Sequence, residues 1–346
     1  MNFIKLINMA IDFSMKKNPN MVTFGLGITD PKGIFGSTLG LEKKYGNDRV
    51  FDVPASENAL TGIGIGLSLS NHPSLLNHQR ADFSFLSFDQ IINSASKWHY
   101  MFDGASNIPL TIRMIIGKGW GQGPTHSQNL HSVFSHFPGL KVVVPSVPED
   151  AGNLLISSIF DPNPVIFLEH RWLHNLKTNS DIKFKNEKIK KHSHIIKGTD
   201  VTVVSISYMT IEAIQASKIL KNQNVSIDLI SLNLLNPIDY SPILKSLNKT
   251  KRLLVLETDF EQCSIGSQII SYVAQKINFR LKAKPRIIAT DNLPEPTSFG
   301  LTKFYYKNYV DIIKTILQML NIKKKIHIPK RKSPHDIPDK FFQGPF

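Results

Sequence analysis

The sequence predicts an α/β protein made of two three-layer α/β/α domains. Short apolar strands alternate with helical stretches along most of the chain, which is typical of parallel sheets covered by helices on both faces. The 346 residues exceed the length of one typical core. The alternation stops between residues 171 and 198, where Lys, Asn, Ser and His predominate. We therefore expect a first domain at 1–175, a linker at 176–198, a second domain at 199–322 and a basic, Pro- and aromatic-rich tail at 323–346.

The first domain opens with apolar residues at helical spacing, interrupted by Lys5 and Asp12, which predicts an amphipathic helix. Apolar runs closed by Gly, Pro or polar residues predict strands. We expect strands at 21–25, 50–53, 108–116, 141–145 and 163–169, and helices at 39–45, from residue 58 onward and at 88–100.

The second domain repeats the alternation on a smaller scale. Its apolar runs predict strands at 201–205, 225–230, 252–256 and 286–289, and the stretches between them predict helices at 211–220, 265–277 and 309–320. The tail after Asn321 has too few apolar residues for a core of its own. We expect it to lie along a surface or a partner.

Composition narrows the class of protein. Hydrophobic residues make up 41% and charged residues 20% of the chain, which is ordinary for a globular protein. Cys263 is the single cysteine, so an internal disulfide and a cysteine-based zinc site are excluded. The N-terminus lacks the features of a signal peptide, and no run of 18 apolar residues occurs. We expect a cytoplasmic protein with no membrane partner.

The net charge of +14 raises the question of nucleic-acid binding. Lysines concentrate at 183–191 and 323–332, within loop-like sequence. Neither cluster has the interleaved aromatic residues of a base-stacking surface. The charge is therefore interpreted as solvated surface charge, and no nucleic-acid partner is expected.

Glu57 lies at a junction between a strand and a helix. Pro54 ends the strand, Ser56 can cap the helix, and the helix itself is apolar with small residues that allow close packing. A carboxyl group at this place should be partly desolvated, which would raise its pKa and suit it to proton transfer near neutral pH. The alternative is an acid that only complements the helix dipole.

His126 lies in a loop that follows a predicted strand and a glycine-rich segment, residues 117–123. Loops at strand ends are where open α/β sheets bind ligands, and a neutral imidazole there could move a proton. The alternative is a structural histidine, and the glycines match no nucleotide-binding motif. Phe83 belongs to an aromatic cluster with Phe85 and Phe88, which indicates core packing or stacking on a heteroaromatic ligand.

Several segments, in this order, resemble the beta subunit of thiamine-diphosphate-dependent 2-oxoacid dehydrogenases, the E1 beta chain of the pyruvate and branched-chain types. The resemblance covers about residues 3–320 and implies a transketolase-like pyrimidine-binding domain followed by a transketolase C-terminal domain. The segments are Lys43-Lys-Tyr-Gly46, Asp52-Val-Pro-Ala-Ser-Glu57, Phe88-Asp-Gln-Ile-Ile-Asn-Ser-Ala-Ser-Lys97, Thr125-His-Ser-Gln128, Pro138-Gly-Leu-Lys-Val-Val-Val-Pro145, Pro148-Glu-Asp-Ala-Gly152, Asp161-Pro-Asn-Pro164 and Gly198-Thr-Asp-Val-Thr-Val-Val204.

The resemblance assigns roles to matching residues. Glu57 falls on the glutamate that hydrogen-bonds the aminopyrimidine ring of thiamine diphosphate, Phe83 on the aromatic residue that packs on this ring and Ala55 on a neighbouring backbone contact. Gln79 and Leu86 fall on further cofactor-pocket positions, where the family usually has other residues. His126 falls on the histidine assigned to substrate orientation and to acyl transfer to lipoamide, so the pair Glu57 and His126 is the implied catalytic set.

The resemblance also implies a structural potassium site, held by backbone and side-chain oxygens, which suit a hard cation. It maps to Leu110, Ser158, Ile159, Asp161 and Asn163. The family's Gly-Asp-Gly…Asn-Asn motif, which holds Mg²⁺ and the diphosphate, is absent from this sequence. This absence implies an E1 alpha partner that binds that end of the cofactor, in an α₂β₂ heterotetramer that is inactive without it.

Some features depart from the family pattern. Leu26-Gly27-Ile28 stands where the family has an acidic pair. The lysine-rich tail also differs from the surface that receives the basic docking domain of the lipoyl acyltransferase E2. Repulsion between like charges would oppose the binding of that domain. Two alternatives therefore remain beside the 2-oxoacid dehydrogenase, which is expected to act on a pyruvate-like 2-oxo acid. One is a transketolase-like carboligase that transfers a two-carbon unit to an aldehyde, and the other is a non-catalytic scaffold subunit.

Overall fold

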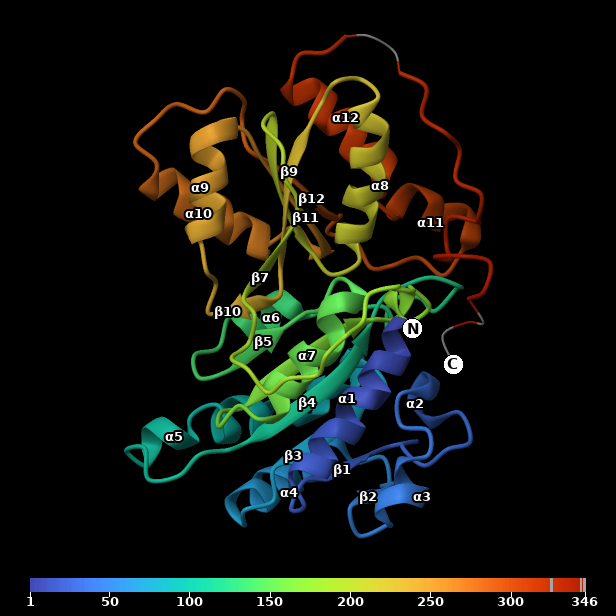
Figure 1. Cartoon of the computed structure of the whole chain (residues 1–346), viewed down its shortest axis with the longest axis vertical. Coiled ribbons are helices and arrows are strands. Elements are labelled where there is room, and N and C mark those ends of the chain that lie inside the picture. Colours follow the sequence, from blue (N-terminus) through green and yellow to red (C-terminus); the bar gives the residue numbers. More distant parts are fainter. Residues whose placement is uncertain (324–325, 343, 345–346) are drawn as a thin grey trace.

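The computed structural model describes residues 1–323, 326–342 and 344 of the chain. Within these residues it has a seven-stranded and a five-stranded sheet, the lower and upper units of Figure 1. Apolar clusters lie on both faces of each sheet, beneath helices. The predicted α/β class with two helix-covered sheets is confirmed.

The first sheet is parallel except at one edge. Its strands are β1 (Val22–Gly25), β2 (Val50–Phe51), β3 (Ser74–His78), β4 (Leu110–Ile116), β5 (Lys141–Val143), β6 (Val165–His170) and β10 (Leu234–Asn236). They follow the order β10-β5-β6-β4-β3-β1-β2, and only β10 is antiparallel to its neighbour among these described strands. The parallel strands therefore deliver their carboxyl ends, and the loops that follow, to one edge.

Helices cover both faces of this sheet. They are α1 (Phe3–Lys17), α2 (Gly33–Gly36), α3 (Leu41–Tyr45), α4 (Glu57–Leu69), α5 (Trp98–Met101), α6 (His131–Ser135) and α7 (Pro148–Ile159), with the helical turns η1 (Ala81–Ser87), η2 (Asp89–Ala95) and η3 (Arg171–Leu173). The Asn2 side chain caps α1 by accepting from the backbone N–H of Lys5 at 3.1 Å. Helices α1 and α7 pack together over one face, and α4 packs with η1 and η2 over the other.

The second sheet has the order β12-β11-β8-β9-β7, with β7 antiparallel to β9. Its strands are β7 (His192–Ile196), β8 (Val201–Ile206), β9 (Ile227–Leu232), β11 (Leu253–Phe260) and β12 (Arg286–Thr290). Helices α8 (Met209–Lys221) and α12 (Tyr309–Met319) cover one face, α9 (Ser241–Thr250) and α10 (Ile265–Lys276) cover the other, and α11 (Phe299–Tyr305) lies near the junction.

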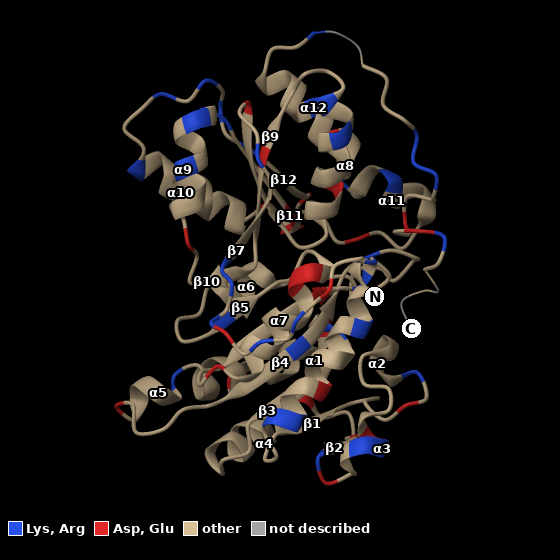
Figure 2. Ribbon diagram, viewed as in Figure 1, with Lys and Arg blue, Asp and Glu red and all other residues tan. Residues whose placement is uncertain are grey.

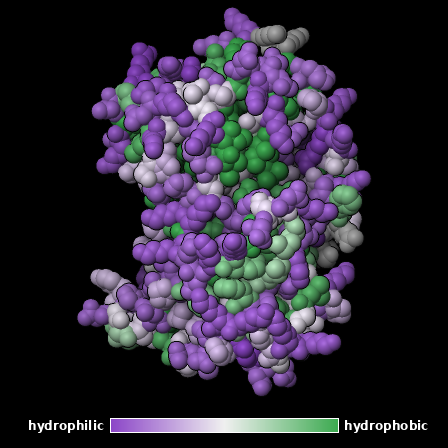
Figure 3. Space-filling model, in the orientation of Figure 1, coloured by the Kyte–Doolittle hydropathy of each residue, from purple (hydrophilic) through white to green (hydrophobic). Residues whose placement is uncertain are grey.

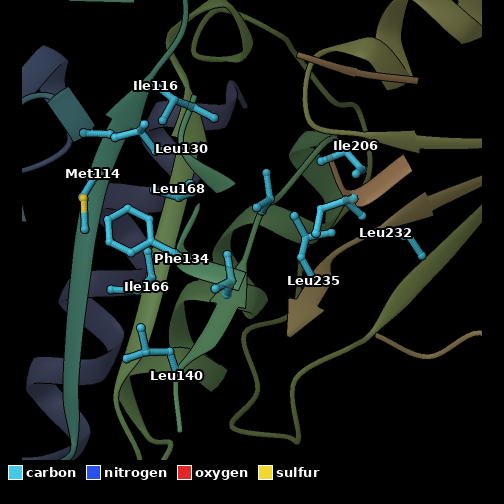
Figure 4. Close-up of a cluster of buried hydrophobic side chains, with 14 of the residues drawn as sticks. Met114, Ile116, Leu130, Phe134, Leu140, Ile166, Leu168, Ile206, Leu232 and Leu235 are labelled. Carbon is cyan, nitrogen blue, oxygen red and sulfur yellow. The ribbon is translucent and has the colours of Figure 1, made fainter. Parts of the chain in front are cut away.

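One apolar cluster is shared by the two units. Figure 4 shows side chains of β4, β6 and α6 on one side of it and side chains of β8, β9 and β10 on the other. Burial of apolar surface contributes about 25 cal/mol per Å². The shared cluster therefore holds the two sheets in a fixed relation. The labelled side chains are Met114, Ile116, Leu130, Phe134, Leu140, Ile166, Leu168, Ile206, Leu232 and Leu235.

Charged and apolar residues are mixed on the surface. Lys and Arg are scattered over helices and loops of both units and form no continuous track in the described residues of Figure 2. Hydrophilic residues cover most of the face in Figure 3, with apolar patches on both units. No helix within 1–323, 326–342 and 344 is long and apolar enough to cross a membrane.

Some elements differ from the prediction. The sequence patterns do not predict β3, α2, α6, α7, α9, β10 or α11. The predicted helix at 88–100 is instead the π-helical η2 followed by the short α5. The predicted linker contains β7, which pairs with β9, so its last residues belong to the second sheet.

The helix after the Glu57 junction is less buried than predicted. Only one side of α4 is covered, and Ile63 on the other side is 50% exposed. Ser56 occupies the N-cap position, but its side chain makes no capping hydrogen bond. Ser56 therefore occupies the predicted N-cap position without making the predicted capping hydrogen bond.

The tail lies along the surface of the chain itself, which is one of the two predicted arrangements. Figure 1 shows it in red, descending along the upper unit to the junction. Ile326 and Ile328 pack against the cluster under α8 and α12. The predicted basic and aromatic tail also includes Lys324, Lys325, Gln343, Pro345 and Phe346, which lie outside the described residues.

A buried histidine joins the two units by polar contacts. His131 Nε2 lies 3.0 Å from Glu257 Oε2, and Nδ1 lies 3.8 Å from Asp259 Oδ2. Glu257 also accepts a hydrogen bond from the Gly266 N–H at 2.8 Å. Burial alone would lower the pKa of His131, but Asp259 and then Glu257 raise it above the ordinary value. His131 is therefore a structural histidine at the junction.

We expect Glu257→Gln to lower the free energy of unfolding by about 3 kcal/mol near pH 5.5, because it removes one partner of a buried pair. The native pKa of His131 lies above its unfolded value of 6.5. The stabilisation is thus fully present below pH 6.5 and is lost as the pH rises through the raised pKa. Urea unfolding at about pH 5.5 and pH 9 measures both values. Glu261→Gln, at an exposed acid just after β11, is the control, and an equal loss at both pH values would contradict the role.

Candidate active site

Loops that follow β1, β3 and β4 meet at the carboxyl edge of the first sheet. They enclose a pocket of 340 Å³. Ligands of open α/β sheets bind outside this edge, so the pocket is the candidate active site. It is lined by Gly27, Asp30, Lys32, Ile34, Phe35, Gln79, Arg80, Phe83 and His126.

Three of the predicted site residues, Phe83, His126 and Gln79, meet in this pocket. The side chain of Phe83 is 38% exposed, and its ring stands edge-on to the His126 imidazole with the centroids 5.5 Å apart. Phe83 is thus a partly open ring, as the ligand-stacking interpretation requires. His126 Nδ1 lies 3.0 Å from Thr125 Oγ1, which leaves Nε2 without a partner among the described residues. Nε2 is therefore the nitrogen that a substrate can reach.

Asp82 fixes the loop that carries His126. Its Oδ1 accepts hydrogen bonds from the backbone N–H of Gln128 at 3.2 Å and from the Gln128 side chain at 3.0 Å. Burial raises the pKa of Asp82, and the bonds from Gln128 oppose that shift. Asp82 follows β3, which the sequence patterns miss, so no sequence signal placed it at the site.

Arg80 brings a positive charge to the pocket. It is 4% exposed, and burial lowers its pKa to about 10, although the nearby Asp82 and Glu295 act in the opposite direction. The guanidinium is therefore charged at neutral pH and suits a ligand that carries a carboxylate. No sequence signal placed Arg80 at the site either, because it too follows β3.

The opposite wall is held by the loop after β1. The Gly27 N–H donates to Asp52 Oδ1 at 2.9 Å, and Gln79 Nε2 donates to the Leu26 carbonyl at 3.2 Å. Gly27 has a φ of +73°, and a Cβ there would overlap Gln79 Nε2. A side chain at position 27 would therefore displace Gln79 from this wall.

Glu57 lies at the start of α4 and is not among the residues that line the pocket. Its carboxylate has no hydrogen-bond or ion-pair partner in the described part of the chain, and the residue is only half-buried. The desolvation predicted for Glu57 is therefore not produced by this chain alone. Ala55 and Leu86 are exposed and lie outside the pocket lining too.

A buried polar network supports the pocket from below. Arg113 in β4 donates to Glu169 in β6 at 3.0 and 2.5 Å and to Asn77 Oδ1 in β3 at 3.0 Å. His174 Nε2 lies 2.9 Å from Glu169. Burial would raise the pKa of Glu169, but Arg113 and His174 lower it to about 2. The network ties together the strands whose ends carry the site.

The residues mapped to a potassium site lie at the other edge of the sheet, where β4 and β6 begin and α7 ends. They are Leu110, Ser158, Ile159, Asp161 and Asn163. Lys141 Nζ lies 2.5 Å from Asp161 Oδ2, and Asp161 Oδ1 accepts from the Asn163 N–H at 3.0 Å. The ammonium group already neutralises the carboxylate, so these residues fit a potassium ion poorly. The described residues include no group of three or more His, Cys, Asp or Glu placed to hold a metal ion.

Comparisons with known proteins identify two domains along the chain. Residues 1–176 match the pyrimidine-binding domain of transketolase, and residues 191–308 match the transketolase C-terminal domain. The beta subunit of acetoin:2,6-dichlorophenolindophenol oxidoreductase from Cupriavidus necator is 34% identical over 320 residues, which cover 89% of this chain and 94% of that protein. The chain belongs to the E1 beta family of transketolase-type subunits.

Other E1 beta chains show the same extent of similarity. The mitochondrial pyruvate dehydrogenase E1 component subunit beta-1 of Oryza sativa is 33% identical over 317 residues, with 89% of this chain and 83% of that protein covered. A solved structure described as "Split gene transketolase, inactive beta4 tetramer" has a TM-score of 0.73 at 17% identity and covers 92% of this chain and 98% of its own. At that identity the likeness shows the fold alone.

The residues of this E1 beta chain fit the pyrimidine end of thiamine diphosphate in part. Phe83 offers a partly exposed ring, Gln79 an amide and Glu57 an unpartnered carboxylate at the neighbouring helix start. Side chains on α4 and η1 beside them leave apolar surface exposed, including Ile63, Phe85 and Leu86. The chain therefore presents one side of a site and leaves the other side open.

We expect Asp82→Ala to loosen the loop of residues 117–128, because it removes both hydrogen bonds to Gln128. Bonds to a charged acceptor contribute about 2 kcal/mol. Amide hydrogen exchange should become faster in this loop and stay unchanged in α7. Asp89→Ala, at an exposed acid on η2, is the matched control, and unchanged exchange in Asp82→Ala would contradict the holding role.

Proposed function

We propose that this chain is the beta subunit of a 2-oxoacid dehydrogenase that, with an alpha partner, decarboxylates a pyruvate-like 2-oxo acid and passes the acyl group to lipoamide. The observation that carries the proposal is the pocket in which Phe83 and His126 meet. Glu57, at the start of α4, is not among the residues that line it. Membership of the thiamine-diphosphate-dependent E1 beta family supports the proposal.

Thiamine diphosphate supplies a carbon nucleophile and accepts the electrons released with CO₂ when it is bound. The residues of this chain would bind, orient and transfer protons around it. Glu57 would share a proton with the aminopyrimidine ring, and Phe83 would pack on that ring. His126 Nε2 would hydrogen-bond the oxygen of the substrate or acyl group, and Arg80 would attract the substrate carboxylate.

The alpha partner is proposed on two grounds. The sequence has no Gly-Asp-Gly…Asn-Asn motif to hold Mg²⁺ and the diphosphate. Several apolar side chains of α4 and η1 are exposed, as expected of a surface that another subunit covers. An α₂β₂ assembly would bury Glu57 and provide the desolvation that this chain lacks.

Two further points stay predictions. One is the docking of an E2 acyltransferase. The other is the cytoplasmic compartment, which we expect although the relatives include plant mitochondrial proteins.

The similarity to an acetoin oxidoreductase subunit favours a second candidate, in which the same half-site acts on acetoin. The carboligase and scaffold alternatives remain less supported. Co-expression with a chain that carries Gly-Asp-Gly…Asn-Asn, followed by a screen of 2-oxo acids and acetoin with an artificial electron acceptor, separates the candidates. If neither substrate class reduces the acceptor, the carboligase and scaffold alternatives remain, and formation of a carboligation product from an added aldehyde distinguishes between them.

We expect Glu57→Gln in the assembled enzyme to lower the rate of decarboxylation by about a hundredfold or more, because the amide cannot exchange a proton with the ring. The circular dichroism spectrum and the assembly state should not change. Glu42→Gln, at an exposed acid in the first turn of α3, is the control. Wild-type rates in Glu57→Gln would remove the proposed role.

We expect His126→Ala to leave binding of thiamine diphosphate unchanged and to lower acylation of lipoamide by about a hundredfold, since the imidazole acts on the acyl group and not on the cofactor. Calorimetry measures the binding, and stopped-flow acylation measures the transfer. His136→Ala, at an exposed histidine after α6, should match wild type in both. Unchanged acylation in His126→Ala would count against the assignment.

A further inference from the structure

The tail is fixed to the second unit by specific contacts, although residues 326–342 form no helix or strand. The Tyr309 hydroxyl donates to the Pro329 carbonyl at 2.6 Å. Arg331 donates to the Ile337 carbonyl at 2.9 Å and lies 3.6 Å from the Glu212 carboxylate. His335 Nε2 lies 2.8 Å from Thr302 Oγ1 of α11. These anchors hold the path of the tail to the junction between the units.

The end of the tail packs on the loop that carries His126. A Cβ at Gly119 would overlap the Asp336 carbonyl, and a Cβ at Gly344 would overlap the ring of Trp120. The rings of Trp120 and Phe342 stand edge to face, with the centroids 6.3 Å apart. Two of the close approaches thus occur at glycines, where no side chain is in the way.

The tail also backs the opposite wall of the pocket. The Arg171 guanidinium lies between two rings, 4.4 Å from the centroid of Phe35 and 5.0 Å from that of Phe342. It also donates to the Gly344 carbonyl at 3.0 Å. Phe35 lines the pocket, and its φ of 59° is a left-handed value that costs energy for a non-glycine residue. Phe342 therefore supports a strained wall through Arg171.

None of the described tail residues lines the pocket. The tail therefore lies behind both walls and does not plug the opening. We propose that it is a strap that holds the His126 loop and the Phe35 wall at their working separation. Phe342 is the positioning residue: it contacts Trp120 of the loop directly and reaches the Phe35 wall through Arg171. This inference rests on the proposed function only in the second test below, which measures the activity of the enzyme.

The first test uses this chain alone. Phe342→Ala should shift the tryptophan emission to longer wavelength and speed chymotrypsin cleavage after Trp120, because it removes the ring that stands edge to face with the half-exposed Trp120. Phe341→Ala is the matched control, since its neighbouring ring is 67% exposed, and Phe342→Tyr should restore wild-type behaviour. If Phe342→Ala and Phe341→Ala show the same emission and the same cleavage rate, the strap proposal is overturned, whichever reaction the enzyme catalyses.

The second test uses the enzyme assembled with its alpha partner. Phe342→Ala should lower kcat for lipoamide acylation about tenfold, because small displacements of a positioned group carry such costs, and should leave KM for the 2-oxo acid and the melting temperature unchanged. A purely structural role would instead lower the melting temperature with kcat per folded enzyme unchanged, which would overturn the positioning claim. If wild-type enzyme shows no 2-oxo acid activity, the proposed function fails and the first test still decides the strap.

Discussion

The ion pair between Arg113 and Glu169 is the interaction on which the site depends most. Both side chains are almost fully buried, and together with Asn77 they join β3, β4 and β6. Removal of one partner of such a pair costs about 3–5 kcal/mol, because the other charge is left buried and unpaired. Strands β3 and β4 carry the loops with Arg80, Phe83 and His126, so their register sets the geometry of the pocket.

A second constraint is that the chain builds only one side of its site. The carboxylate of Glu57 has no partner among the described residues, and apolar side chains of α4 and η1 remain open beside it. A buried acid can be tuned for proton transfer, but a half-exposed one is screened by water. Covering this surface would both bury apolar area and desolvate Glu57. In the proposed assembly, the same contact would therefore serve both subunit association and catalysis.

Much of the fold follows from sequence pattern. Apolar runs such as those of β4, β8 and β11 predict strands because their residues are buried on both faces. Strand β3 is missed because it ends in Asn77 and His78, polar residues that are buried in this fold. The π-helix η2 has no sequence signature separate from that of an α-helix. Strand β10 is short and belongs by sequence to the other domain.

The site is predictable only where a family motif marks it. Glu57 and His126 lie in such motifs, whereas the resemblance assigns Phe83 outside the quoted segments. Phe83 and His126 do meet. Asp82 and Arg80 act through contacts that follow an unpredicted strand. Tertiary packing explains two of the glycines at 117–123. A side chain at Gly119 would overlap the tail, and one at Gly117 would overlap the ring of His170. No local pattern could reveal this packing.

The most direct test of the half-site account is calorimetric titration of thiamine diphosphate and Mg²⁺ into this chain alone and into the complex with its alpha partner. The account predicts weak or undetectable heat with the chain alone and saturable binding in the complex, which Glu57→Gln weakens. Equally tight binding by the isolated chain would contradict it.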